Sequence, residues 1–146
     1  MRFIGAGELE AELRGAIASA GLGQRVDLLG ELEPEALAAA YRAADALVLA
    51  SHREGRPNVV LEALASGLPI AARPSGGTPE LLRHTPDCLA AGPSIEALAD
   101  ALAFALGSQA PSRTTQRTAI AELTWSHSAE VLTSLLLRAV EEGPRL

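Results

Sequence analysis

The sequence predicts an α/β domain in which a mainly parallel sheet is flanked by helices and followed by a helical C-terminal tail. Short apolar runs alternate with longer amphipathic segments, which is the pattern of repeated βα units. A chain of 146 residues corresponds to one domain by length, and its 48% apolar content is sufficient for a hydrophobic core.

The first four elements are expected in the order strand, helix, strand, helix. Leu9, Leu13 and Ile17 lie on one face of a helical period between two short apolar runs. Pro34 suits the first turn of a helix, where its missing N–H is not needed. The expected elements are a strand at 2–6, a helix at 9–20, a strand at 25–30 and a helix at 34–43.

The next elements are expected to form the centre of the sheet. The segment "DALVLAS" is almost continuously apolar, as strands covered on both faces usually are. Gly67 is expected to end the helix that follows. Thr78 is expected to be an N-cap with Pro79 at the first helical position. The expected elements are a strand at 45–51, a helix at 57–66, a strand at 68–72 and a short strand at 88–92.

The rest of the chain is expected to be helical, over 95–106, 113–122 and 126–140. In the last of these helices Val131, Leu135 and Leu136 would face the body of the domain. The polar segment "GSQAPSRTTQ" is the plausible linker. It divides the chain into residues 1–106, which carry the sheet, and residues 107–146, a helical extension expected to pack on the same domain.

Composition excludes several classes of function. The net charge of −6 argues against a general nucleic-acid binder, which needs a concentrated basic face. All twelve basic residues are arginine, so a mechanism that requires lysine must take it from another chain. Cys88 is the single cysteine and the three histidines are scattered, so neither a disulfide nor a metal site is expected. Without a long apolar run or a secretory leader, the chain is expected to be cytoplasmic, with peripheral attachment at the inner membrane face left open.

A Gly5-Ala6-Gly7 turn follows the first expected strand. A strand, G-x-G and a helix also open the dinucleotide fingerprint, but Glu10 stands where its third glycine would be. We reject a nicotinamide cofactor on that ground. A tight strand-to-helix turn explains the glycines, although a phosphate could still approach such a turn.

A second turn, "SHREGRPN", leads from the 45–51 strand into the next helix. Pro57 pushes Arg56 out of the helical region, so the helix begins sharply there. Arg56 stands at the N-cap position but has no short oxygen acceptor, which leaves the first amides, those of residues 58–60, without a side-chain partner. With Gly55 allowing close approach, this helix start could hold a diphosphate, or water could satisfy the amides equally well.

Two carboxylates flank this helix start. Asn58, Glu62 and Ser66 are spaced by four and share a face, which an ordinary solvent face would also explain. Glu54 precedes the helix at the carboxyl end of a strand, where ligands bind in open α/β sheets. Carboxylates on both sides of an anion-ready helix start suit a ligand with a central diphosphate and hydroxyls at both ends, such as a nucleotide sugar.

These segments resemble a known family in their order along the chain. "EGRPNVVLEALASGLPIAARPSGGTPELL" is similar to the signature segment of the retaining GT-B glycosyltransferases of family 4 (group 1). "FIGAGELEAEL", "RVDLLGELEPEALAAAYRAADALVLAS" and "LTWSHSAEVL" resemble consecutive parts of that family's donor-binding domain. The resemblance implies that residues 1–106 form a Rossmann-like nucleotide-sugar-binding domain, the C-terminal half of a GT-B fold.

The resemblance also implies roles for individual residues. Glu54 would be the catalytic contact to hydroxyls of the transferred sugar, and Glu62 would accept hydrogen bonds from the ribose. The donor would be held by Gly55, Arg56, Pro57, Asn58 and Val59, the nucleobase would lie against Gly30, Glu31 and Leu32, and Gly5 and Gly7 would border the cleft. No metal and no cofactor are expected besides the nucleoside-diphosphate sugar, which is the donor substrate.

The resemblance further implies that parts of the enzyme lie outside this chain. The family's donor domain begins one strand and one helix earlier, with an arginine and a lysine that clamp the diphosphate. We therefore expect an N-terminally truncated chain that is weakly active or inactive alone and needs an acceptor-binding domain in cis or in trans. Loss of the first strand would leave either a gap between the 2–6 and 45–51 strands, inviting self-association, or a direct pairing of the two.

Three functions remain in competition. The leading hypothesis is the donor-binding part of a hexosyltransferase that transfers a sugar from a nucleotide sugar to an acceptor with retention. A non-catalytic interaction or scaffold module that keeps the fold is the second. A nucleotide-sugar epimerase fragment with the same donor site is the third and least favoured.

Overall fold

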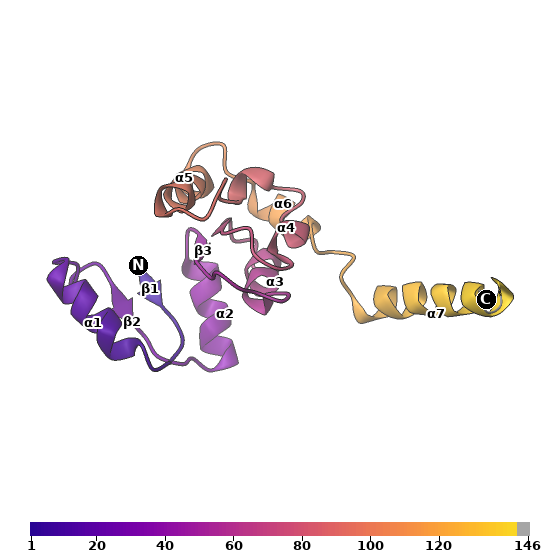
Figure 1. The fold of residues 1–146 in the computed structure, drawn as a ribbon, viewed down its shortest axis with the longest axis horizontal. Coiled ribbons are helices and arrows are strands. Elements are labelled where there is room, and N and C mark those ends of the chain that lie inside the picture. Colours follow the sequence, from indigo (N-terminus) through magenta and orange to yellow (C-terminus); the bar gives the residue numbers. More distant parts are fainter. Residues whose placement is uncertain (143–146) are drawn as a thin grey trace. The chain divides into compact units, whose positions relative to one another are not determined.

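The computed structural model describes residues 1–142, whose helices and strands are shown in Figure 1. The architecture is α/β, with parallel strands flanked by helices, which confirms the predicted fold class. The chain divides into two compact units, one over residues 1–40 and one that begins at Tyr41. The predicted boundary between residues 106 and 107 stays a prediction.

The first unit is a βαβ arrangement. Its strands β1 (Arg2–Phe3) and β2 (Asp27–Leu28) pair in parallel and are connected through α1 (Glu10–Ser19). Both strands are shorter than predicted because Gly5 and Gly30 adopt positive φ values of 126° and 67°. These left-handed conformations end the extended backbone where glycine alone tolerates the turn.

The apolar face predicted for the first helix is only partly covered. Leu13 and Ile17 are half-buried, whereas Leu9 is 71% exposed and stands at the N-cap of α1. The N-cap side chain is apolar and accepts no capping hydrogen bond, but Glu10 and Glu12 in the first turn suit the positive end of the helix dipole.

Helix α2 (Pro34–Ala43) follows with the predicted bounds. Glu35 lies in its first turn and Arg42 in its last, so both charges complement the helix dipole. Tyr41, in the last turn, is the buried residue of this helix.

The second unit contains another parallel βαβ arrangement. Strands β3 (Leu47–Leu49) and β4 (Ile70–Ala72) pair with Leu47 opposite Ile70, and α3 (Asn58–Ala65) connects them. Strand β4 is fully buried, and both α3 and α5 (Ile95–Leu106) contact it. The prediction of a fully covered 45–51 strand is wrong, since β3 is only half-buried.

Gly67 ends α3 as predicted. It has a φ of 73° and donates from its amide to the Leu64 carbonyl at 2.9 Å. A β-carbon at this position would lie 2.8 Å from the carbonyl oxygen of Arg113, so the lack of a side chain also allows α6 (Arg113–Thr118) to approach. Gly67 therefore both ends α3 and allows α6 to pack closely against this end.

Two local predictions after β4 are wrong. Gly77, not Thr78, is the N-cap of α4 (Thr78–Leu81), because Thr78 begins the helix with its side chain buried. The predicted strand at 88–92 is reduced to a single parallel bridge between Leu89 and Ala72. A 3₁₀ turn, η1 (Pro86–Cys88), occupies the start of that segment and leaves too little extended backbone for a strand.

The last two helices differ in how they are covered. Helix α6 ends earlier than predicted, contacts α3 and buries Gln116 completely. In α7 (Trp125–Glu142), Val131, Leu135 and Leu136 are 44%, 51% and 58% exposed, so the prediction that they pack on the domain is wrong. The 3.6-residue period correctly places them together, but it does not specify which surface covers them.

The strand pairing bears on the two arrangements considered for the sheet. In the described residues β1 pairs with β2 within the first unit and β3 pairs with β4 within the second, and the choice between a gap and a direct pairing of the 2–6 and 45–51 strands stays a prediction. Self-association through an incomplete sheet stays a prediction. No helix within the described range is both long and apolar enough to cross a membrane.

Candidate functional site

Two loops meet at the carboxyl edge of the β3–β4 pair. One runs from Ala50 to Pro57 and the other from Arg73 to Gly77, and parallel strands bring both to the same edge. The Ser75 hydroxyl donates to the Ser51 carbonyl at 3.2 Å. The Gly77 amide donates to the Gly55 carbonyl at 2.6 Å. The second loop therefore holds the backbone of the loop that carries Glu54.

Gly76 and Gly77 allow this close approach. A β-carbon on Gly76 would lie 1.8 Å from the Glu54 carbonyl oxygen, and one on Gly77 would lie 3.0 Å from the Gly55 carbonyl oxygen. Gly76 also has a φ of 53°, which side chains rarely tolerate. Sequence reasoning noted the glycine pair only as part of the family pattern and missed its contact with Glu54. Adjacent glycines at the carboxyl end of an apolar strand are the signal that could have revealed it.

The start of α3 is uncapped, as predicted, but the capping position is shifted by one residue. Pro57, not Arg56, is the N-cap, and no side chain accepts a hydrogen bond there. The prediction is wrong for Val60, whose amide donates to the Pro57 carbonyl at 3.2 Å. Within residues 1–142, the amides of Asn58 and Val59 have no protein acceptor. This helix start therefore has two free donors at its positive end.

Residues around the helix start differ in exposure. Glu54 is half-buried and Pro57 is buried, whereas Gly55, Arg56, Asn58 and Val59 are exposed. The exposed guanidinium groups of Arg53 and Arg56 bring positive charge to the same loop. The guanidinium group of Arg73, by contrast, contacts another side chain, because its Nη1 atom lies 2.7 Å from Nε2 of His52. An anion at the helix start would therefore meet free amides and exposed guanidinium groups together.

Packing of α3 determines which way Glu62 points. Val60, Ala63 and Leu64 are fully buried on one face, and Glu62 lies on the exposed face. The Tyr41 hydroxyl donates to Oε2 of Glu62 at 2.9 Å. Glu62 is therefore more than part of a solvent face, because a buried phenol holds its carboxylate.

Tyr41 was missed by sequence reasoning, which had no local signal for a contact across 21 residues. Burial raises the pKa of Tyr41 well above its ordinary value, and the hydrogen bond to Glu62 and the negative charge of that carboxylate raise the pKa further. The phenol is therefore protonated at neutral pH and acts as a donor to Glu62.

An alkaline titration is expected to show this coupling. In the native chain Tyr41 should ionise well above pH 10. In denaturant the pKa of Tyr41 should return to its ordinary value of about 10. Because the folded state retains this proton longer, the free energy of unfolding should fall as pH rises above about 10, by at most about 1.4 kcal/mol per unit. Tyr41 is the single tyrosine, so near-ultraviolet absorbance of tyrosinate reports it alone.

The charge of Glu62 can be tested in the same titration. Glu62→Gln keeps an acceptor oxygen and removes the negative charge, so the pKa of Tyr41 should fall toward, but not reach, its ordinary value. Glu96→Gln, at an exposed position in α5, is the matched control and should leave the titration unchanged. Ionisation of native Tyr41 near pH 10 would contradict the structure.

The remaining predicted residues lie in the first unit. The Gly5 amide donates to the Gly30 carbonyl at 2.8 Å, which brings these two glycines together at the carboxyl edge of β1 and β2. Glu31 is exposed and Leu32 half-buried in the chain that follows β2. The structure describes this group and the Glu54–Glu62 group in different units, so a single cleft between them stays a prediction.

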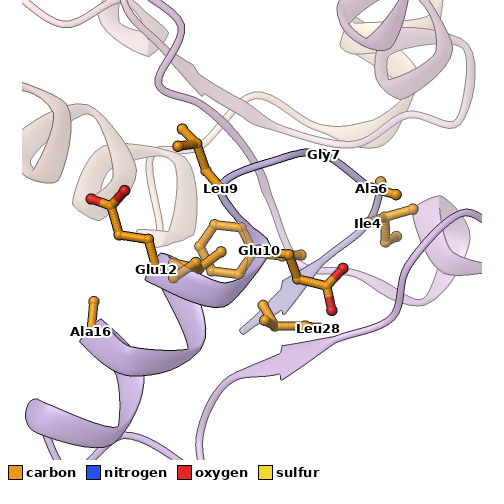
Figure 2. Close-up of a pocket in the computed structure, with 11 residues that line it drawn as sticks. Ile4, Ala6, Gly7, Leu9, Glu10, Glu12, Ala16 and Leu28 are labelled. Atoms are coloured by element: carbon orange, nitrogen blue, oxygen red, sulfur yellow. The ribbon is translucent and has the colours of Figure 1, made fainter.

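A cavity of about 500 Å³ opens between α1 and the first two strands. Figure 2 shows Ile4, Leu28 and Glu10 around it, with the turn through Gly7 above the start of α1. Gly5 and Gly7 line the cavity, but residues 54–62 do not. Glu10 and Glu12 also line it, and their negative charges make it a poor phosphate site. No group of residues suited to a metal ion occurs in the described part of the chain.

Comparison with known proteins identifies relatives over most of the chain. Residues 1–122 match the family described as "Glycosyl transferases group 1". D-inositol 3-phosphate glycosyltransferase of Mycobacterium avium (strain 104) is 33% identical over 127 residues, covering 84% of this chain and 30% of that protein. The protein of the same name from Nocardia farcinica (strain IFM 10152) is 36% identical over 129 residues, covering 86% of this chain and 27% of its own length.

A solved structure shows the same fold. Sucrose-phosphate synthase from Thermosynechococcus elongatus matches with a TM-score of 0.76 and 27% sequence identity, covering 97% of this chain and 39% of that one. Its GT-B architecture agrees with the helix-flanked parallel strands seen here. The chain spans about 30% of the curated relatives reported above.

Proposed function

This chain belongs to the group 1 glycosyl transferases, and we propose that it is the donor-binding part of an enzyme that uses a nucleoside-diphosphate sugar. The observation that carries the proposal is the arrangement of Glu54 and Glu62 on either side of the uncapped start of α3. We further propose that the chain belongs to the retaining enzymes of family 4 and acts in the cytoplasm.

The chemistry of each group suits one part of such a donor. The free amides of Asn58 and Val59 would bind diphosphate oxygens, supported by the helix dipole. Glu62 would accept hydrogen bonds from ribose hydroxyls, and Glu54 from hydroxyls of the transferred sugar. Gly30, Glu31 and Leu32 would lie against the nucleobase, with Gly5 and Gly7 at the border of the cleft.

The transfer would break the bond between the anomeric carbon and the diphosphate oxygen. An acceptor hydroxyl would form the new bond to that carbon, and the nucleoside diphosphate would leave with the bonding electron pair and take up the proton that the hydroxyl loses. Negative charge grows on the leaving diphosphate during this step, so the amides and nearby arginines would stabilise it. Glu54 would hold the sugar in position while positive charge develops on its ring.

The chain alone would carry out little turnover. It contains no lysine to neutralise the diphosphate. The relatives are more than three times as long as the matched segment, and we propose that an acceptor-binding domain, in cis or in trans, completes the cleft. Binding of the donor is therefore a sharper test than activity.

Calorimetric titration with nucleoside diphosphates and their sugars should show saturable binding to the chain. Glu62→Gln should weaken the affinity of the best ligand by about 10- to 100-fold, as expected for loss of a hydrogen bond to a charged group. Glu96→Gln, at an exposed glutamate of α5, should leave the affinity unchanged. Absence of binding at millimolar concentrations would overturn the proposal and favour a non-catalytic module with the same fold.

A further inference from the structure

The contact between Tyr41 and Glu62 joins a buried group to an exposed one. Tyr41 is 9% exposed in the last turn of α2, whereas Glu62 lies on the open face of α3. Their hydrogen bond of 2.9 Å connects two helices across 21 residues of sequence. We infer that Tyr41 is a positioning residue, which holds the Glu62 carboxylate so that it recognises the ribose hydroxyls of a nucleoside diphosphate.

The hydrogen bond restricts a side chain that would otherwise be mobile. A glutamate on an open helix face samples many rotamers, and a ligand that binds it must immobilise it. Val60, Ala63 and Leu64 anchor the opposite face of α3 in the core, and the bond to Tyr41 then restrains the carboxylate on this anchored helix. Tyr41 thus reduces the entropy lost when a ligand engages Glu62.

The two carboxylate oxygens of Glu62 have different surroundings. Oε2 accepts a hydrogen bond from the Tyr41 hydroxyl, whereas Oε1 accepts no hydrogen bond from residues 1–142. A fixed carboxylate with one oxygen free and one partly occupied is suited to adjacent hydroxyls, such as those at the 2′ and 3′ positions of ribose. A ligand that lacks one of these hydroxyls would lose part of the interaction.

The direction of the hydrogen bond is stable under ordinary conditions. The raised pKa of Tyr41 keeps its phenol protonated at neutral pH, so the phenol donates and the carboxylate accepts. A purely structural role is the alternative, since a buried tyrosine hydroxyl usually finds some partner. The two roles differ in whether Tyr41 affects the ribose specifically.

The test compares ribose with deoxyribose, and it rests on the proposed donor-binding function. Dissociation constants are measured by calorimetry for UDP, GDP and ADP and for their 2′-deoxy counterparts, with the wild-type chain and with Tyr41→Phe, Glu62→Gln and the double variant. Tyr41→Phe keeps the buried ring and removes only the hydroxyl. Thr85→Val, which removes another buried hydroxyl of the same unit, is the control.

Wild type should prefer the ribose form of the best ligand by about tenfold or more. Tyr41→Phe should reduce this preference at least about threefold, because it should weaken binding of the ribose form more than binding of the deoxy form, which keeps only the 3′ hydroxyl. Glu62→Gln should bring the preference close to one, and the double variant should show no further loss. Thr85→Val should keep the wild-type preference.

Failure of the inference can be distinguished from failure of the proposed function. Equal weakening of both sugar forms in Tyr41→Phe, or an unchanged preference, would overturn the positioning role and leave donor binding intact. Nucleoside diphosphate binding without any ribose preference in wild type would overturn the role of Glu62 and, with it, that of Tyr41. Absence of all binding would overturn the proposed function itself.

Discussion

Gly76→Ala is expected to abolish nucleoside diphosphate binding and to lower the free energy of unfolding by about 2–4 kcal/mol. The new β-carbon would lie 1.8 Å from the Glu54 carbonyl oxygen and 2.6 Å from its carbonyl carbon. Both partners are backbone atoms, so no side-chain rotation relieves the overlap. The φ of 53° adds strain of its own for alanine.

Relief of this overlap requires one loop to move away from the other. The movement would break the hydrogen bond from Gly77 to Gly55 and displace Glu54 relative to the start of α3. Calorimetric titration measures the loss of binding, and urea denaturation measures the loss of stability. A variant that binds as tightly as wild type would show that the loop contact does not position Glu54.

Gly92→Ala is the matched control for this substitution. Gly92 lies in the same unit, has no atom within 4 Å of its added β-carbon and is not among the glycines with positive φ. We expect its stability to stay within about 0.5 kcal/mol of wild type. Equal effects of the two substitutions would contradict the close approach described for Gly76.

Leu64→Ala is expected to lower the free energy of unfolding by about 2–5 kcal/mol. Leu64 is fully buried in α3, so truncation removes apolar contacts and leaves a cavity that the surrounding core cannot fill. Thermal and urea denaturation would both shift to milder conditions. Leu64→Met, which nearly conserves volume, should cost less than about 1.5 kcal/mol.

An exposed leucine of the last helix provides the comparison. Leu132 is 58% exposed in α7, so Leu132→Ala should change the unfolding free energy by no more than about 0.5 kcal/mol. The same denaturation experiments measure both variants. A large loss for Leu132→Ala would show that α7 packs on a surface of the domain, contrary to the structure.

Helices with strong local signals were predicted accurately. Helix α2 begins at Pro34 and ends at Ala43 as predicted, and α5 keeps its predicted bounds from Ile95 to Leu106. Ser94 caps α5 by accepting from the Ala97 amide at 3.1 Å. Proline at a first turn, a capping hydroxyl and an amphipathic period all act within a few residues, so each can be recognised in the sequence alone.

Strand lengths and burial were predicted less well. Apolar runs indicated where extended segments would occur, but Gly5 and Gly30 shorten the first two strands through their left-handed φ values. The apolar run of β3 indicated a fully covered strand, whereas β4 is the buried one. The burial of a strand depends on which helices pack on it. Because α5, which packs on β4, comes from a distant part of the sequence, local patterns did not indicate this burial.

The candidate site also combines residues that the sequence indicated with contacts that it did not indicate. Glu54, Glu62 and the uncapped start of α3 were found from spacing, from the position after an apolar strand and from proline geometry, all of which are local, although the N-cap was predicted at Arg56 and lies at Pro57. Tyr41 and the contact of Gly76 with Glu54 were missed, because each joins segments about 20 residues apart. A hydrogen bond or a backbone approach across such a distance leaves no periodic trace in the sequence.

Local chemistry alone thus specified the βα pattern, the helix starts and ends at Pro34 and Gly67, and the two carboxylates around α3, since propensity, capping and periodicity act between near neighbours. Long-range packing decided which strand became buried, left the apolar side chains of α7 exposed, and attached Glu62 to Tyr41. These outcomes depend on the simultaneous fit of segments that are distant in sequence, so they arise only when the chain has folded.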